Sequence, residues 1–228
     1  MKLAERPAAQ MKLVGGRVCL DFVNTVGGRE PSESAKLAAT SGQIRADKLA
    51  DYDDLLAWSW HAGLLREPSA QNLAREAVRR QPEAAAIWRR AVALREALYR
   101  LCRAQLHHLS PLSADLETLN QELNVAHGRV RVNSAAGHFV WEWTDSKNAL
   151  DQMLWRIADA AAEMLTADDL TRLRECPGES CGWLFLDVSK NNRRQWCDMQ
   201  TCGNVAKVRR FRARSASAKP AAARRQRR

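Results

Sequence analysis

The sequence predicts a mainly α-helical protein: a helical N-terminal domain with one small β-hairpin, then a four-cysteine hairpin and a basic helix. Three observations predict this fold. Apolar residues recur every three or four positions in most stretches between residues 47 and 165. Residues 129–143 alternate instead, which is typical of paired strands. Two close cysteine pairs stand near the C-terminus, and a basic run follows them.

The N-terminal stretch opens with an apolar run after Gly15-Gly16. Short apolar runs fit a strand or a first helix equally well, so residues 13–26 stay open between the two. Asp21 and Asn24 stand three apart within it and would share a face if the run is helical. They are candidates for a ligand-binding pair that lines a pocket, or else they form a helix cap or a turn bond. Met11-Lys12-Leu13 repeats Met1-Lys2-Leu3, which leaves open a start at Met11 and dispensable first residues.

Several core-forming helices follow. Their apolar spacing predicts them at residues 47–65, 69–80, 82–107, 113–124 and 146–165. Arg89, Arg90, Arg95 and Arg100 are expected to point outward from the third of them. The hairpin of residues 129–133 and 138–143 is expected to pack on the helices, although its basic and aromatic residues also fit a contact with nucleic acid.

The four C-terminal cysteines have the spacing of a metal site. The pattern is C-x4-C, fifteen residues, then C-x4-C, so that two tight turns each offer two thiolates. It predicts one structural zinc ion bound by Cys176, Cys181, Cys197 and Cys202. The segment between the pairs is expected to form a hairpin with the metal at its base, with Trp183, Phe185 and Trp196 as its small core. The alternative, disulfides or unrelated thiols, is disfavoured in a chain with no secretory signal. Cys19 and Cys102 are expected to be unpaired reduced thiols.

The charge of the chain is concentrated at its C-terminal end. Residues 171–228 hold 15 Lys and Arg against 4 Asp and Glu, whereas the rest of the chain holds 21 against 22. The whole excess of +10 therefore belongs to this end, which indicates a polyanion partner. The tail after residue 214 has no core-forming pattern and is expected to be disordered.

The same residues resemble a known family. CPGESC, FLDVSKNNRRQWCDMQTCGN and AKVRRFRAR resemble the CGNR zinc finger, a bacterial module assigned to DNA binding. Where that family has arginine, this chain has Val205. The LDFVNT segment at residues 20–25 and the helices after it resemble the accompanying ABATE domain. The resemblance implies a stress-induced transcriptional regulator with a sensing helical part. The expected domains are residues 1–170, 171–214 and 215–228.

The helix after the zinc site is the expected contact with double-stranded DNA. Val205, Val208 and Phe211 would pack on the finger and leave a cationic side for the major groove. The candidate DNA-binding residues are Lys190, Arg193, Arg194, Lys207, Arg209, Arg210, Arg212 and Arg214.

Other classes of function stay weaker or are disfavoured. The alternative is a zinc-stabilised RNA-binding or protein-interaction module, because small four-cysteine modules serve all these roles. Nothing favours an enzyme: no phosphate-cradling loop, HExxH or nucleophile motif occurs, and four thiolates leave zinc no open position. With no signal sequence and no apolar run of membrane-spanning length, the expectation is a cytoplasmic protein. A homodimer and an unknown small-molecule effector are left open.

Overall fold

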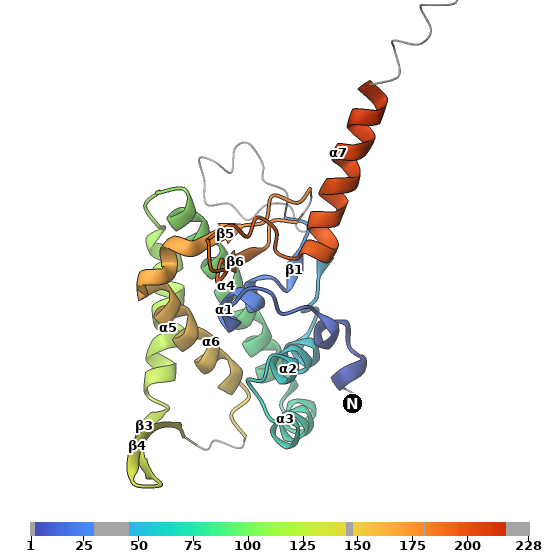
Figure 1. The fold of residues 1–228 in the computed structure, drawn as a ribbon. Helices are drawn as coiled ribbons and strands as arrows, with labels where there is room; N and C mark the ends of the chain where they lie inside the picture. The colour runs from blue at the N-terminus through green and yellow to red at the C-terminus, as the bar shows by residue number, and fades with distance from the viewer. Residues whose placement is uncertain (1–2, 30–45, 145–147, 180, 218–228) are drawn as a thin grey trace, which may run out of the picture.

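The computed structural model describes residues 3–29, 46–144, 148–179 and 181–217. It confirms the mainly helical fold with small antiparallel hairpins and a helix after the cysteines. Figure 1 shows the helices gathered in one body, from which the last helix projects at the upper right. The described helices of the body are α1 (Val18–Val23), α2 (Tyr52–His61), α3 (Glu67–Arg79), α4 (Gln81–Leu106), α5 (Ser113–His127) and α6 (Gln152–Thr166).

Short elements connect these helices and extend them at both ends. The described 3-10 turns are η1 (Leu3–Glu5), η2 (Pro7–Gln10) and η4 (Asp168–Arg172). The strand pairs are β1 (Val26–Gly27) with β2 (Ala46–Asp47), β3 (Val130–Ala135) with β4 (His138–Trp143), and β5 (Leu173–Glu175) with β6 (Leu184–Leu186). A π-helical turn, η5 (Met199–Gly203), leads into α7 (Asn204–Ser217).

The N-terminal residues belong to the folded body. Leu3, Ala8 and Ala9 are buried in the main core, where η1 and η2 pack against α2. The guanidinium of Arg6 donates to the carboxylate of Asp54 at 2.7 Å and also pairs with two neighbouring aspartates. The first ten residues are therefore not dispensable for this packing.

The predicted helix starting at Asp47 begins five residues later. Asp47 lies in β2, where its carboxylate accepts hydrogen bonds from both terminal nitrogens of Arg95, each at 2.7 Å. Asp51 caps α2 by accepting from the backbone N–H of Asp54. At the other end, Gly63 has a φ of +74° just after the last turn. Asp47 is thus used in a tertiary ion pair rather than in the helix.

The remaining boundaries differ for similar reasons. Ser69 lies inside the first turn of α3, which begins at Glu67 with Pro68 in its first turn, and Ser69 is not the cap. The helix expected from residue 146 begins at Gln152, and the residues expected to open it, 145 and 146, lie outside the described part. α7 continues to Ser217, three residues past its predicted end at residue 214, and residues 218–228 lie outside the described part.

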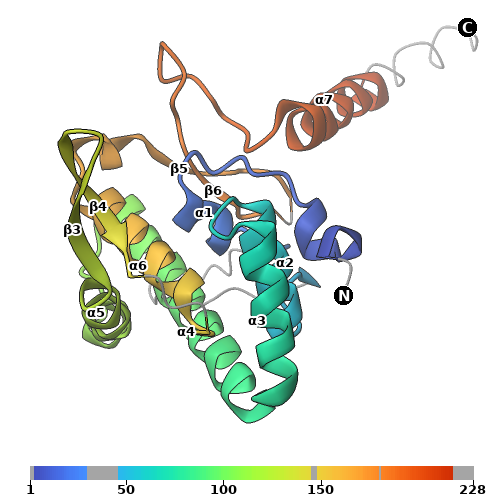
Figure 2. The same cartoon turned by 90° about the horizontal axis from the view of Figure 1, so that it is seen from below.

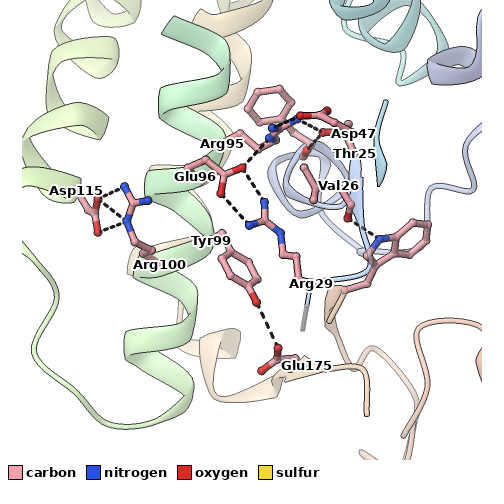
Figure 3. A network of polar contacts seen from close by, with 12 residues as sticks. Thr25, Val26, Arg29, Asp47, Arg95, Glu96, Tyr99, Arg100, Asp115 and Glu175 are labelled. Atoms are coloured by element: carbon pink, nitrogen blue, oxygen red, sulfur yellow. Dashed lines mark hydrogen bonds and ion pairs between the residues drawn. The ribbon is translucent and has the colours of Figure 1, made fainter. Parts of the chain in front are cut away.

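Arg95 does not point outward as expected. Its side chain is only 1% exposed and donates to Asp47, Glu96 and Thr25 (Figure 3). Arg90 and Arg100 also make ion pairs, with Glu122 and Asp115. Apolar spacing misses these cases because it sorts residues by their own hydrophobicity and does not show which carboxylate a distant segment brings beside them.

The hairpin β3–β4 is confirmed, but only its base packs on the helices as expected, where Trp143 stacks on Trp155 of α6. The register pairs Val130 with Trp143 and Ala135 with His138, across a two-residue turn at Ala136 and Gly137. Both turn residues have positive φ, +49° and +87°, which suits the twist of a hairpin. Most side chains of both strands are exposed, and Figure 1 shows the hairpin below the helices at the lower left.

Candidate metal centre and basic helix

The four C-terminal cysteines converge on one point. Their four Sγ atoms all lie within 4.8 Å of one another. The Sγ–Sγ distances Cys181–Cys197 and Cys197–Cys202 are both 3.6 Å. Sulfurs about 2.3 Å from a zinc ion at the centre of a tetrahedron stand about 3.8 Å apart. All six cysteines are free, so these distances are not those of disulfides. The donor set therefore fits a structural four-thiolate zinc ion.

Tight backbone turns bring the first pair of sulfurs together. The N–H of Cys181 donates to the carbonyl of Gly178 at 3.0 Å, and the N–H of Cys176 donates to that of Trp183. A side chain at Gly178 would meet the sulfur of Cys202 at 3.1 Å. This glycine is needed so that the two turns can approach each other.

The second pair is positioned by η5. The side chain of Asp198 caps this turn by accepting from the N–H of Gln200. Gly203 is buried there, and a β-carbon on it would stand 2.5 Å from the sulfur of Met199. Gly203 thus lies directly against the side chain of Met199, which is 48% exposed.

The thiols influence one another's protonation. The thiols of Cys181 and Cys197 donate hydrogen bonds to the sulfur of Cys176, which lowers the pKa of Cys176 far below its ordinary value. The site therefore favours a thiolate at Cys176, the form that binds zinc.

The hairpin of the finger is not the one expected from the sequence. β6 pairs with β5, the strand before the first cysteine, and not with a strand after it. The Cys176–Cys181 turn therefore lies at the end of the β5–β6 hairpin. Residues 187–197 form a loop. In that loop Asp187 accepts from the hydroxyl of Ser189, which lowers the pKa of Asp187, and from the backbone N–H groups of Ser189 and Arg194. The small core is as expected in kind: Phe185 is fully buried, with Trp183 and Trp196 packed beside it.

The finger is built into the body. Leu173, Leu184 and Leu186 of its strands belong to the main core. The indole N–H of Trp183 donates to the carbonyl of Val26 at 2.9 Å. Because both parts share one core, the zinc site has a defined place on the helical body.

Asn24 and Asp21 hold this junction. Asn24 is 3% exposed; its amide donates to the carbonyl of Leu184 at 2.8 Å and accepts from the N–H of the same residue at 2.9 Å. Asp21 accepts from the N–H of Gly15 at 2.8 Å, and burial raises its pKa. These contacts to backbone groups are those of the turn-bond alternative.

Arg194 is also used inside the protein. Its guanidinium donates to the carbonyls of Val14, Trp196 and Cys197 and lies 4.3 Å from the ring centre of Phe185. These internal contacts leave the guanidinium of Arg194 unsuited to the predicted contact with DNA. Its neighbour Arg193 is exposed, as is Lys190.

Helix α7 presents its cations to solvent. Its described contacts are concentrated on η5, and Figures 1 and 2 show the helix extending away from the other elements. The expected packing of its apolar side chains on the finger is wrong, because Val205, Val208 and Phe211 are 63%, 49% and 71% exposed. The exposed cations along it are Lys207, Arg209, Arg210, Arg212 and Arg214.

A small cavity lies where α7 leaves the zinc site. It has a volume of about 300 Å³, and Trp196, Glu179 and Arg210 contribute to its walls. Glu179 forms an exposed ion pair with Arg209 across it. The root of the helix is thus a cationic surface with one compensating carboxylate.

A buried polar network, missed by sequence reasoning, joins the body to the zinc finger (Figure 3). The guanidinium of Arg29, 1% exposed, forms two 2.8 Å hydrogen bonds with Glu96 and lies 3.9 Å from the ring centre of Tyr99. The hydroxyl of Tyr99 lies 3.5 Å from Glu175, next to the zinc ligand Cys176. A side chain at Gly182 would meet the carbonyl oxygen of Arg29 at 2.9 Å. No local sequence pattern predicts these pairs, because their members are far apart in the chain.

Comparison with protein families agrees with this arrangement. Residues 16–168 match the ABATE family, described as a putative stress-induced transcription regulator. The chain belongs to the ABATE family. Residues 172–215 of this ABATE protein match the CGNR zinc finger. With the four converging cysteines, the match shows one zinc-binding site. No curated protein matches the sequence. Among the described helices of this ABATE protein, none has the length and apolarity needed to span a membrane.

Proposed function

We propose that this ABATE protein is a zinc-dependent transcriptional regulator that binds double-stranded DNA through α7. The observation that carries the proposal is the helix itself: it stands away from the body, bears five exposed cations and starts at the zinc site. An exposed, strongly basic helix of this size fits the major groove. The family description, a regulator, is consistent with this role.

Seven cations form the proposed contact surface. Arginines on α7 would reach phosphates or guanine edges, while Val208 and Phe211 are exposed beside them and could contact thymine methyl groups. The ion pair of Arg209 with Glu179 would exchange for a phosphate. The full set is Lys190, Arg193, Lys207, Arg209, Arg210, Arg212 and Arg214.

Zinc would act by fixing the direction of α7. The helix begins two residues after Cys202, and the intervening Gly203 is buried. Loss of the metal would free the start of the helix, so that DNA binding would lose its rigid base. A small-molecule effector stays an open part of the proposal.

The test is selection of randomised duplex DNA by the zinc-loaded protein, followed by titrations at several salt concentrations. If about six phosphates are neutralised, the log-log slope of affinity against salt should be near −5. Lys207→Ala with Arg210→Ala should reduce the slope by about 2. The matched control, Arg75→Ala with Arg89→Ala, removes two exposed cations from the body and should leave the slope unchanged.

The exposed apolar residues of α7 also favour a second candidate, a protein contact. Val205, Val208 and Phe211 follow one another every three residues and have no covering partner among the described residues. If no motif is enriched and both pairs of variants bind duplex DNA equally, the DNA proposal fails and the protein-contact or RNA-binding alternative takes its place.

A further inference from the structure

The β3–β4 hairpin forms an arm with one apolar face. Residues directly opposite in an antiparallel pair point to the same side of the sheet. The register therefore places Val130, Val132, Phe139, Trp141 and Trp143 together on one face. The other face holds Arg131 and Glu142 among its members.

This face is covered at its base and open toward its tip. Trp143 stacks on Trp155 of α6, with ring centres 6.4 Å apart. Trp141 and Phe139, further out on the same face, are 75% and 82% exposed, and Val132 is 58% exposed. Neighbouring large apolar side chains left in solvent mark an interaction site.

A cavity of about 480 Å³ lies between the base of the arm and α6. Three carboxylates are among its lining residues, and two of them, Asp159 and Glu163, stand one helical turn apart on α6. The lining residues are Val130, Trp141, Glu142 and Trp143 of the arm, Asp159 and Glu163 of α6, and His127 at the end of α5.

We propose that a second copy of this chain occupies the arm, so that two arms pack face to face and antiparallel. In that arrangement the tip of each arm enters the cavity of its partner. With six residues in each strand, an arm is about 20 Å long, the distance from tip to base. An isologous pair of this kind requires one surface to be complementary to itself.

The tip and the cavity have complementary chemistry. The tip presents Phe139, and residues 133–139 contain no carboxylate, so the tip brings no like charge toward Asp159 and Glu163. Trp141 and Trp143 offer the aromatic wall against which Phe139 would pack.

The size of the face also favours a second copy over a small ligand. A ligand in the cavity would cover Trp141 but leave the exposed tip in water. Two buried aromatic residues on each of two arms remove roughly 600 Å² from solvent, and the valines and strand edges bring the total near the ~1,000 Å² of specific interfaces. Figure 1 shows the arm and α7 at opposite ends of the molecule, so the dimer leaves α7 free.

The first experiment measures the mass of the full-length, zinc-loaded protein by sedimentation over a range of concentrations. The protein should dimerise, and Phe139→Ser should raise the dimer Kd at least about 100-fold, since a symmetric interface loses two anchors. The matched control is Phe211→Ser on α7, which removes a phenylalanine of similar exposure, 71%, and should leave the Kd unchanged. A monomer up to about 100 µM, or a dimer lost in Phe211→Ser and kept in Phe139→Ser, would overturn the proposal.

A second experiment tests the position of the tip. A benzophenone-bearing phenylalanine analogue is placed at position 139 in one isotopically labelled copy and mixed with unlabelled protein. Photolysis should join it to residues 152–166 or 141–143 of the other copy. Cross-links confined to one chain would contradict the exchange of tips. Neither readout involves DNA, so failure here and failure of the proposed DNA binding are separate results.

Discussion

At the scale of single residues, the adjacent Arg193 and Arg194 have different roles that the sequence does not distinguish. Arg193 and Arg194 are adjacent in a basic loop, and both fit a contact with DNA when only charge is considered. In the structure Arg193 is exposed, whereas Arg194 donates to three backbone carbonyls around the zinc site. Charge alone therefore does not distinguish a DNA contact from a structural residue.

Arg194→Ala should destabilise the finger while Arg193→Ala should not. The substitution leaves three carbonyls without their charged donor and removes the stack on Phe185, at a cost of about 3 kcal/mol. Release of zinc to a colorimetric chelator, measured at rising urea concentration, should begin earlier in Arg194→Ala alone. Equal zinc retention in the two variants, with DNA binding lost only in Arg194→Ala, would return this residue to the contact set.

At the scale of elements, α7 and the β3–β4 arm share one property: most of their length is not covered by the core. Each presents apolar side chains to water, Phe211 on one and Phe139 on the other. Each is anchored at its base, α7 at η5 and the arm through Trp143 on α6. Elements that project in this way contribute little to the core and are free to contact a partner.

Val205→Arg should tighten binding to duplex DNA. Val205 lies in the first turn of α7 and is 63% exposed, so a longer cationic side chain meets no steric obstacle there. One further phosphate contact should make the salt slope steeper by about 0.9. Zinc content, measured on the same samples, should stay at one ion per chain. An unchanged slope with full zinc content would mean that this position faces away from the DNA.

At the scale of the whole molecule, the zinc site is part of the core rather than an appended module. Leu173, Leu184 and Leu186 stand on both sides of the first cysteine pair and are buried with the helices. Asn24, in the N-terminal segment, bonds to Leu184 of β6. Arg29 bonds to Glu96 of α4 and lies against Gly182 in the turn before β6. Loss of the metal should therefore destabilise the helices.

Removal of zinc by a chelator should lower the Tm of helix unfolding by at least about 10 °C. A loss of several kcal/mol of binding free energy corresponds to such a shift for a chain of 228 residues. Circular dichroism of the helices, recorded with chelator and after zinc is restored, measures this change and its reversal. An unchanged Tm after complete zinc removal would show that the body folds independently of the finger.

The sequence by itself determined the zinc ligands, the helical class and the position of the basic helix. These follow from local patterns: the spacing of Cys176 to Cys202, apolar periodicity and a run of cations. Local patterns report what a segment can form, because helices, turns and ligand pairs are set by residues a few positions apart.

Only the tertiary structure decided which faces are covered. It placed Arg95 inside and Phe211 outside, assigned Asn24 to the junction with Leu184, and paired β6 with β5. It also left the outer part of the arm open, although its alternation suggested packing on the helices. The physical reason is that burial of a side chain depends on partners from distant parts of the chain, and their positions are not contained in any local pattern.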